Sequence, residues 1–236
     1  MVSEVAEKIV AETRIPVRIK FSKTGKLKYI SHLDLNRTVQ KIFVRAKIPI
    51  WYTEGYNPIP KIVFASPLSL GSESVCEFMD IKIVTEMDFS EMMNRMNATS
   101  PTGFEITEIY TPASKFTNAV YSEYDIEVTA PMMTESSVPE IYKLFKEPLV
   151  LTKRTKSGEK ETDITPFIRK ISAKYEGELL KITAILAADS ANYLNPEYLI
   201  TALKTKTNIF TGDILNERHA ITRTKMYAPD GETEFK

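Results

Sequence analysis

The sequence contains very little cysteine, and this excludes several kinds of chemistry. Cys76 is the single cysteine among the 236 residues. The chain therefore cannot form an internal disulfide or ligate an iron–sulfur cluster by itself. A free cysteine in an ordinary globular composition is usually a small buried hydrophobe, which is what we expect of Cys76. The absence of a disulfide framework also suits a reducing compartment and favours a cytoplasmic protein.

The sequence also lacks the motifs of metal and nucleotide sites. Its two histidines, His32 and His219, are far apart, and no H-E-x-x-H pattern is present. There is no Walker loop, no G-x-G-x-x-G and no G-x-S-x-G, so nucleotide hydrolysis, a Rossmann site and an α/β-hydrolase have no support. We therefore expect no metal site and no cofactor.

Long apolar runs are missing as well. No stretch approaches the roughly 18 consecutive apolar residues of a membrane span. The N-terminus mixes Glu and Lys with its apolar residues, which is not the pattern of a signal peptide. We interpret residues 1–13 as a short amphipathic helix ended by Pro16. These features predict a soluble protein without a membrane partner.

The charges that are present balance overall but are unevenly distributed. The chain has 31 basic and 31 acidic residues, yet Arg14–Ile62 holds eleven basic residues against Asp34 and Glu54. Over Gly71–Tyr110 the balance reverses, with eight acidic residues against two basic ones. This asymmetry is typical of a surface that faces a polyanion. A solvated face neutralised by acidic neighbours in space explains it equally well.

Hydrophobic periodicity predicts an α+β fold of two halves. Each half reads as a ferredoxin-like βαββαβ unit with an antiparallel sheet and helices on one face, and the second half has an inserted hairpin. The predicted domains are 1–112, which carries the basic segment, and 119–229, followed by a polar tail over 230–236. Two extended stretches are expected over 17–30, around a turn at 23–26. The other strands and helices are expected at 35–46, 61–71, 76–84, 88–97, 104–110, 124–130, 138–147, 171–186, 196–206 and 221–228, and the hairpin at 149–164 with its turn at 157–158.

A basic helix begins at Ser31-His-Leu-Asp34. Ser31 and Asp34 have capping-box spacing, in which the hydroxyl accepts a free helix N–H and the acid reaches back. Arg37, Lys41 and Arg45 then recur every four residues opposite the apolar positions. The spacing predicts a basic stripe along one helix face.

His32 is the one candidate for acid–base chemistry. At a helix N-terminus it could meet a phosphate held by free N–H groups, with cations around it. A histidine whose ring hydrogen-bonds locally and fixes the strand–helix joint is the favoured interpretation. His219 is expected at the surface, and the Lys153–Lys160 hairpin reads as a solvated turn rather than a second phosphate contact.

The segment after the helix, YTEGYNPIPK, must be irregular because it holds Gly55, Pro58 and Pro60. Its tyrosines and Lys61 are what a loop that stacks a base and contacts phosphate would contain. A rigid crossover whose tyrosines pack on the sheet is an equal alternative. Trp51 is expected in the core.

The string from Phe21 to Asp80 resembles a particular family. It reads F-S-K-x-G-x-L-x-Y-I-S-H-L-D-L, then Arg45-Ala46, G-Y-N-P-x-P-K and P-L-x-x-G-x-E-S. This pattern is similar to the radical SAM-linked proteins of unknown function, a domain found alone or at the C-terminus of cobalamin-binding radical SAM proteins. The resemblance implies a radical SAM partner and a role in RNA modification. Family members often have N-P-H-P-K where this chain has Ile59, which argues against a catalytic role for that position.

Three functions remain open from the sequence. The first is an RNA-binding accessory module for a structured RNA such as tRNA or rRNA. The second is a metal-independent endoribonuclease with His32 as general acid or base, since the duplicated element order is similar to that of CRISPR repeat-processing endoribonucleases. The third is a domain that docks a radical SAM protein. The residues expected to bind RNA are Arg18, Lys20, Lys28, His32, Arg37, Arg45, Tyr56, Asn57 and Lys61, with Tyr52 as the alternative to Tyr56 for stacking on an unpaired base.

Overall fold

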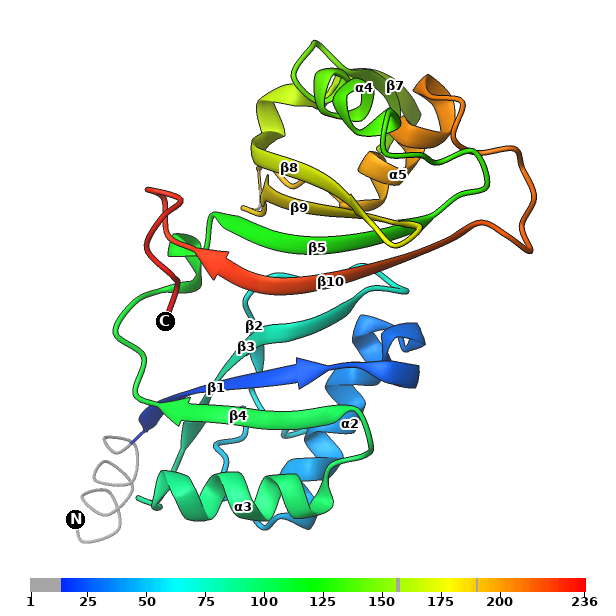
Figure 1. Ribbon diagram of the computed structural model, residues 1–236. Coiled ribbons are helices and arrows are strands. Elements are labelled where there is room, and N and C mark those ends of the chain that lie inside the picture. The colour runs from blue at the N-terminus through cyan, green and yellow to red at the C-terminus, as the bar shows by residue number, and fades with distance from the viewer. Residues whose placement is uncertain (1–13, 156–157, 190) are drawn as a thin grey trace, which may run out of the picture. The chain divides into compact units, whose positions relative to one another are not determined.

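The computed structural model describes residues 14–155, 158–189 and 191–236. They form two compact units, the first ending at Phe116 and the second running from Thr117 to Phe235. Each unit is a mixed α+β structure with an antiparallel sheet, and the described residues contain four α-helices (Figure 1). The helix predicted over 1–13 lies outside the described residues.

In the first unit, a sheet with strand order β4-β1-β3-β2 carries both helices on one face (Figure 1). All the strand pairs in this sheet are antiparallel. The elements are β1 (Ile15–Lys23), the 3-10 helix η1 (Gly25–Tyr29), α2 (His32–Arg45), β2 (Val63–Phe64), β3 (Glu73–Ile83), α3 (Phe89–Thr99) and β4 (Phe104–Tyr110).

Simple periodicity explains the core of this unit. Val17 and Phe21 alternate with polar residues along β1, so one side of the strand is buried. Leu35 and Val39 form part of the buried face of α2, and Met92 lies on that of α3. These side chains pack into one apolar cluster between sheet and helices. The outer face of α2 is thereby left to solvent.

Two stretches predicted as extended are different in the structure. Residues 25–29 form η1 instead of a strand, since Gly25 has a φ of 61° and Leu27 N–H donates to Thr24 O at 3.3 Å. Of the predicted run over 61–71, only Val63–Phe64 form a strand, which pairs with β3. Cys76 is buried, as predicted.

The C-terminus of α2 is a Schellman turn that determines where the following loop begins. Lys47 N–H donates to Val44 O at 3.2 Å, and Ile48 N–H donates to Phe43 O at 3.1 Å. Lys47 takes the left-handed conformation with a φ of 52°. Ile48 and Phe43 are both buried, so an apolar contact accompanies the turn.

The second unit has strand order β10-β5-β9-β8, again antiparallel. A two-stranded hairpin is inserted between α4 and β8. Of its predicted turn at 157–158, residue 157 lies outside the described residues and Gly158 begins the second strand of the hairpin. The elements are β5 (Tyr121–Thr129), α4 (Ser137–Leu144), β6 (Val150–Thr155), β7 (Gly158–Asp163), β8 (Ile168–Glu176), β9 (Leu179–Ala187), α5 (Glu197–Lys206) and β10 (Arg218–Tyr227).

The C-terminal residues are not the simple polar tail that the sequence predicts. Asp230 accepts hydrogen bonds from the N–H groups of Glu232 and Thr233, both at 2.9 Å, and so turns the chain back. Phe235 N–H then donates to Met226 O at 2.8 Å. The Phe235 ring is buried because this turn returns it to the end of β10.

The described residues contain neither a membrane-spanning helix nor a grouped set of metal ligands. In residues 14–155, 158–189 and 191–236, no helix combines the length and apolar character needed to cross a membrane. Within the same part of the chain, no three His, Cys, Asp or Glu side chains are grouped as metal ligands would be.

Candidate functional site

The outer face of α2 presents a row of three cations. Arg37, Lys41 and Arg45 are exposed and follow one another at four-residue spacing. Each step along this row advances about 6 Å along the helix axis. The sequence pattern predicted this stripe, and the structure confirms that all three side chains are on the solvent side of the helix.

The N-terminus of α2 partly neutralises the first of these cations. Asp34 N–H donates to Ser31 Oγ at 3.1 Å, and the Ser31 hydroxyl donates to Asp34 Oδ2 at 2.7 Å. Arg37 Nη1 donates to Asp34 Oδ1 at 3.3 Å. The Ser31 hydroxyl, followed by the Arg37 guanidinium, holds the pKa of Asp34 below its usual range. The predicted cap is therefore present, because the Ser31 hydroxyl accepts the free Asp34 N–H. The Asp34 carboxylate, however, accepts from the Ser31 hydroxyl and not from the Ser31 backbone N–H as in a capping box.

The other two cations of the row have no acidic partner among the described residues. Lys41 and Arg45 form no ion pair with any residue that the structure describes. Their charges are available to a ligand that brings its own negative charge.

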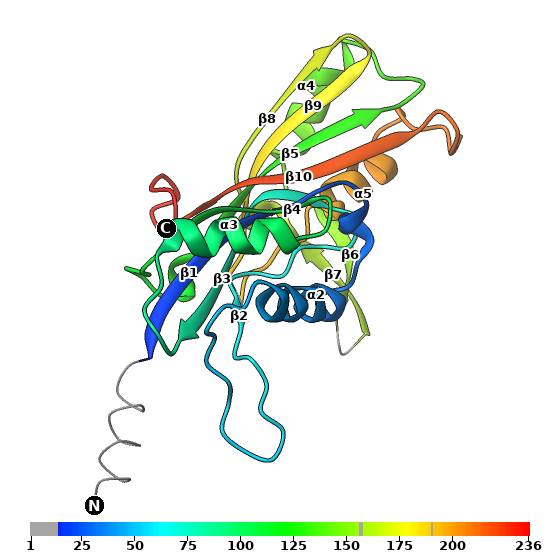
Figure 2. The same ribbon diagram turned by 90° about the horizontal axis from the view of Figure 1, so that it is seen from below.

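The segment from Trp51 to Lys61 is an irregular hairpin that projects beside α2. Thr53 N–H donates to Ile59 O at 2.8 Å, and Tyr52 bridges Pro60. Figure 2 shows this connection between α2 and β2 extending away from the sheet. Tyr56 near its tip is 100% exposed, and Asn57 beside it is also exposed.

The base of this hairpin is fixed by cations packed on Trp51. The Arg14 guanidinium lies 4.4 Å from the indole centroid, and Lys61 Nζ lies 6.0 Å from it. Arg14 Nη2 also donates to Glu54 Oε1 at 2.6 Å. Trp51 was predicted in the core, but it is half-buried, because its ring is the surface on which these cations pack.

The helix and the hairpin together enclose a shallow pocket of about 380 Å³. Cations from α2 form one side, and apolar surface from the hairpin forms the other. The lining residues are Arg37, Gln40, Lys41, Val44, Arg45, Tyr52 and Pro60.

Arg18, one of the predicted RNA contacts, is in a different environment. Its side chain is 0% exposed and donates to both carboxylate oxygens of Asp80, with each distance at 2.8 Å. It also donates to Ser114 O at 2.8 Å, and its guanidinium lies 4.4 Å from the Phe116 ring centroid. A buried and fully engaged guanidinium offers a phosphate no surface, so the prediction for Arg18 is wrong.

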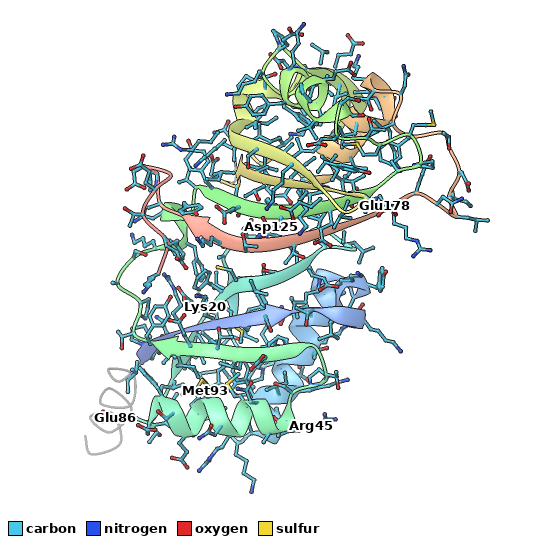
Figure 3. The ribbon with its side chains drawn as sticks, viewed as in Figure 1. Lys20, Arg45, Glu86, Met93, Asp125 and Glu178 are labelled. Atoms are coloured by element: carbon cyan, nitrogen blue, oxygen red, sulfur yellow. The ribbon has the colours of Figure 1, made fainter. Side chains whose placement is uncertain are left out.

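Lys20 and Lys28 are also outside the pocket. Lys20 Nζ lies 2.9 Å from Glu108 Oε1, and Lys28 Nζ lies 3.1 Å from Glu73 Oε1. Figure 3 shows Lys20 on the face of the sheet away from α3, whereas Arg45 lies at the end of α2. The basic residues of the Arg14–Lys61 segment therefore do not form one continuous patch.

His32 begins α2 but does not line the pocket. Its ring is exposed and contacts Phe64 edge-on, with centroids 5.0 Å apart. It makes no hydrogen bond with any residue that the structure describes. The aromatic contact explains its position at the helix start without acid–base chemistry, but the hydrogen bond that we predicted for its ring is not formed.

The other basic features of the sequence have local partners in the second unit. His219 Nε2 lies 3.2 Å from Glu197 Oε2, and Lys153 Nζ donates to Tyr193 O at 3.0 Å. Neither lies in the pocket beside α2.

Sequence reasoning missed four residues of the pocket. Lys41 belongs to the basic repeat but was not among the expected RNA contacts. Gln40 and Val44 carry a signal that could have identified them, since four-residue spacing places them on one side of α2. No local signal places Pro60 against a helix that ends fifteen residues earlier.

A family model matches residues 16–196, and its description is an uncharacterized protein conserved in bacteria (DUF2344). The chain belongs to this family. The match includes α2, the hairpin and the pocket between them. Comparison with curated proteins finds no match.

Several solved structures are similar in shape but distant in sequence. A chain of a Cbf5-Nop10-Gar1 complex is 10% identical with a TM-score of 0.48, and the similarity covers 94% of this chain and 52% of that one. This chain therefore spans about half of that protein's length. An unknown protein from Galdieria sulphuraria is 10% identical with a TM-score of 0.25, covering 89% of this chain and 98% of that one. DyPB from Rhodococcus jostii RHA1 is 9% identical with a TM-score of 0.24, covering 94% and 96%. These TM-scores are too low to support an inference about function.

Proposed function

We propose that this protein is an RNA-binding accessory module. The observation that carries the proposal is the pocket of about 380 Å³ beside α2. Arg37, Lys41 and Arg45 line one side of it, and Tyr52 lines the other. Cations supply affinity for phosphates, and an aromatic ring beside them suits an unpaired base. Neutral overall charge does not oppose this, because binding depends on the local field of the cationic row.

In this proposal the residues divide their roles by position. Lys41 and Arg45 contact phosphates, and neither is paired with an acid among the described residues. Arg37 also contacts a phosphate, but the phosphate must compete with Asp34 for its guanidinium. Lys61 remains a candidate at the base of the hairpin, and Tyr56 and Asn57 extend the surface at its tip. Lys20 and Lys28 would reach a phosphate only by leaving their carboxylate partners.

Three further expectations belong to the same proposal. The partner is a radical SAM protein that modifies the RNA, as the resemblance over 21–80 implies. The two units are ferredoxin-like halves, which their strand orders β4-β1-β3-β2 and β10-β5-β9-β8 support. The protein works in the cytoplasm, which its single buried cysteine suits.

The test measures the affinity of the full chain for a single-stranded RNA over a range of salt concentrations. Each phosphate neutralised contributes about −0.7 to the slope of log K against log salt for single strands, so three contacts give a slope of about −2. Changing Lys41→Glu and Arg45→Glu together should abolish binding at physiological salt, because both phosphate contacts become repulsive.

The matched control is Lys143→Glu with Lys146→Glu. These exposed lysines on and after α4 give the same change in net charge within the second unit. The control should bind like the unmodified protein. Equal loss in both double variants would attribute the effect to net charge and contradict an α2 site, and no salt-sensitive binding by the unmodified chain would end the proposal.

The endoribonuclease and the protein-docking domain remain alternatives without a specific observation in their favour. The same RNA samples, incubated with EDTA, can be inspected for 2′,3′-cyclic phosphate ends. Cleavage that His32→Ala removes would support the endoribonuclease.

A further inference from the structure

The pocket beside α2 has an apolar side that phosphate binding does not use. Val44 is 63% exposed on the helix, and Tyr52 is 40% exposed across from it. Pro60 bridges the Tyr52 backbone and completes this side. Exposed aliphatic and aromatic groups cost free energy unless a ligand covers them, and a concave group of them is typical of a ligand site.

The hairpin holds Tyr52 in position before any ligand arrives. The Thr53 N–H bond to Ile59 O and the stacking of Arg14 on Trp51 fix the residues on both sides of it. A side chain on a backbone that is already fixed loses less conformational freedom when a flat ligand stacks on it. The geometry therefore favours a planar, apolar-faced partner.

Gln40 adds a polar group that can identify such a partner. Its Nε2 donates to Asn36 Oδ1 at 3.0 Å, which orients the amide and leaves Oε1 as the available acceptor. Oε1 forms no hydrogen bond with the described residues. An acceptor in a mostly apolar pocket suits the N–H edge of a nucleobase.

We propose that this pocket takes one unpaired nucleobase whose flanking phosphates lie on Arg37, Lys41 and Arg45. The proposal rests on the proposed RNA-binding function and specifies its substrate class. The base stacks on Tyr52 against Val44, and Gln40 accepts a hydrogen bond from its edge. Cations about 6 Å apart along α2 follow the successive phosphates of the same strand.

This arrangement selects a single strand, loop or bulge over a continuous duplex. A-form RNA keeps its bases stacked and presents phosphates and 2′-hydroxyls to a protein surface, so no base can enter the pocket without unstacking. An unpaired nucleotide does not require that step. We therefore expect a structured RNA to be bound at an unpaired nucleotide.

The experiment compares two RNAs of equal length, a single strand and a blunt duplex, with the full chain at the same series of salt concentrations. Tyr52→Ala should weaken single-strand binding about 5- to 150-fold, the range seen when one stacked base is lost. Its salt slope should stay unchanged, because the phosphate contacts remain. Tyr52→Phe should restore the affinity, since the ring stacks without its hydroxyl.

Tyr29→Ala is the control, because Tyr29 is 66% exposed in η1 and does not line the pocket. Thermal unfolding of each variant shows whether the hairpin change has affected the fold. If the single strand and the duplex bind equally, or Tyr52→Ala leaves binding intact while Arg45→Glu weakens it, the base pocket is wrong and RNA binding stands. If neither RNA binds, both proposals fail.

A free nucleotide shares the chemistry of one RNA unit, so a third arm uses a nucleoside monophosphate as competitor. Displacement of the single strand only at large excess is the expected result, because one phosphate meets one cation. Displacement by the nucleotide at a concentration equal to that of the RNA would contradict binding of an RNA strand and would make the pocket a mononucleotide site.

Discussion

The buried pair of Arg18 and Asp80 leads to an asymmetric prediction. The Arg18 side chain is 0% exposed, whereas the Asp80 side chain keeps 28% of its surface. Removing Asp80 takes the carboxylate from two nitrogens of a buried cation. Removing Arg18 leaves a carboxylate that water can reach. The two halves of one ion pair should therefore have different effects when lost.

The expected magnitudes follow from this difference in burial. Asp80→Ala should cost about 3–5 kcal/mol, the usual penalty for breaking a buried pair from one side. Arg18→Met keeps most of the apolar volume and introduces no buried charge. It forfeits the bonds to Asp80 and to Ser114 O, and we expect a cost of about 1–3 kcal/mol. The double variant should cost less than the sum of the two.

The assay is urea unfolding followed by tryptophan fluorescence. The chain has a single tryptophan, Trp51, and it lies in the first unit with the ion pair. The signal therefore reports the unit under test and is not averaged over both. Equal costs for the two single variants, or a larger cost for Arg18→Met, would refute the reasoning from burial.

Two further predictions concern the first unit alone. Burial raises the pKa of the Tyr110 phenol to about 12, and its hydroxyl has no partner among the described residues. Because the folded pKa lies above the unfolded value of about 10, the contribution of Tyr110 to stability is complete below pH 10 and is lost as the pH rises toward 12, so unfolding curves for Tyr110→Phe should show a smaller decline over this range. Gly103 has a φ of 89°, and a Cβ there would lie 2.4 Å from Thr24 O. Gly103→Ala should therefore destabilise the unit by about 2 kcal/mol or more in the same urea assay, and a variant as stable as the parent would show that the 24–27 turn can move away.

Local patterns in the sequence predicted much of the fold. Val17, Ile19 and Phe21 alternate with polar residues, so β1 could be read directly as a strand. The alternation predicted a half-buried strand, but Arg18 on the polar side is buried too. Ser31 marks the start of α2 because capping is local chemistry, whereas the helix ends at Arg45 in the Schellman turn, four residues before the Pro49 that was expected to stop it. Residues 25–29 could not be predicted in this way. Their 3-10 turn follows Thr24, whose N–H donates to Gly103 O, so it depends on a segment almost eighty residues away.

The sequence by itself determined that α2 has a basic side and that an irregular, tyrosine-containing loop follows it. Both properties come from spacing and composition within a few residues. It could not distinguish Arg18 from Arg45, because they are equal charges in one segment. Only the tertiary structure decides that Arg18 is buried and paired with Asp80 of β3. It also decides that the hairpin brings Tyr52 to the pocket that Arg45 lines. Burial and pairing are set by elements distant in sequence, and the pocket beside α2 depends on them.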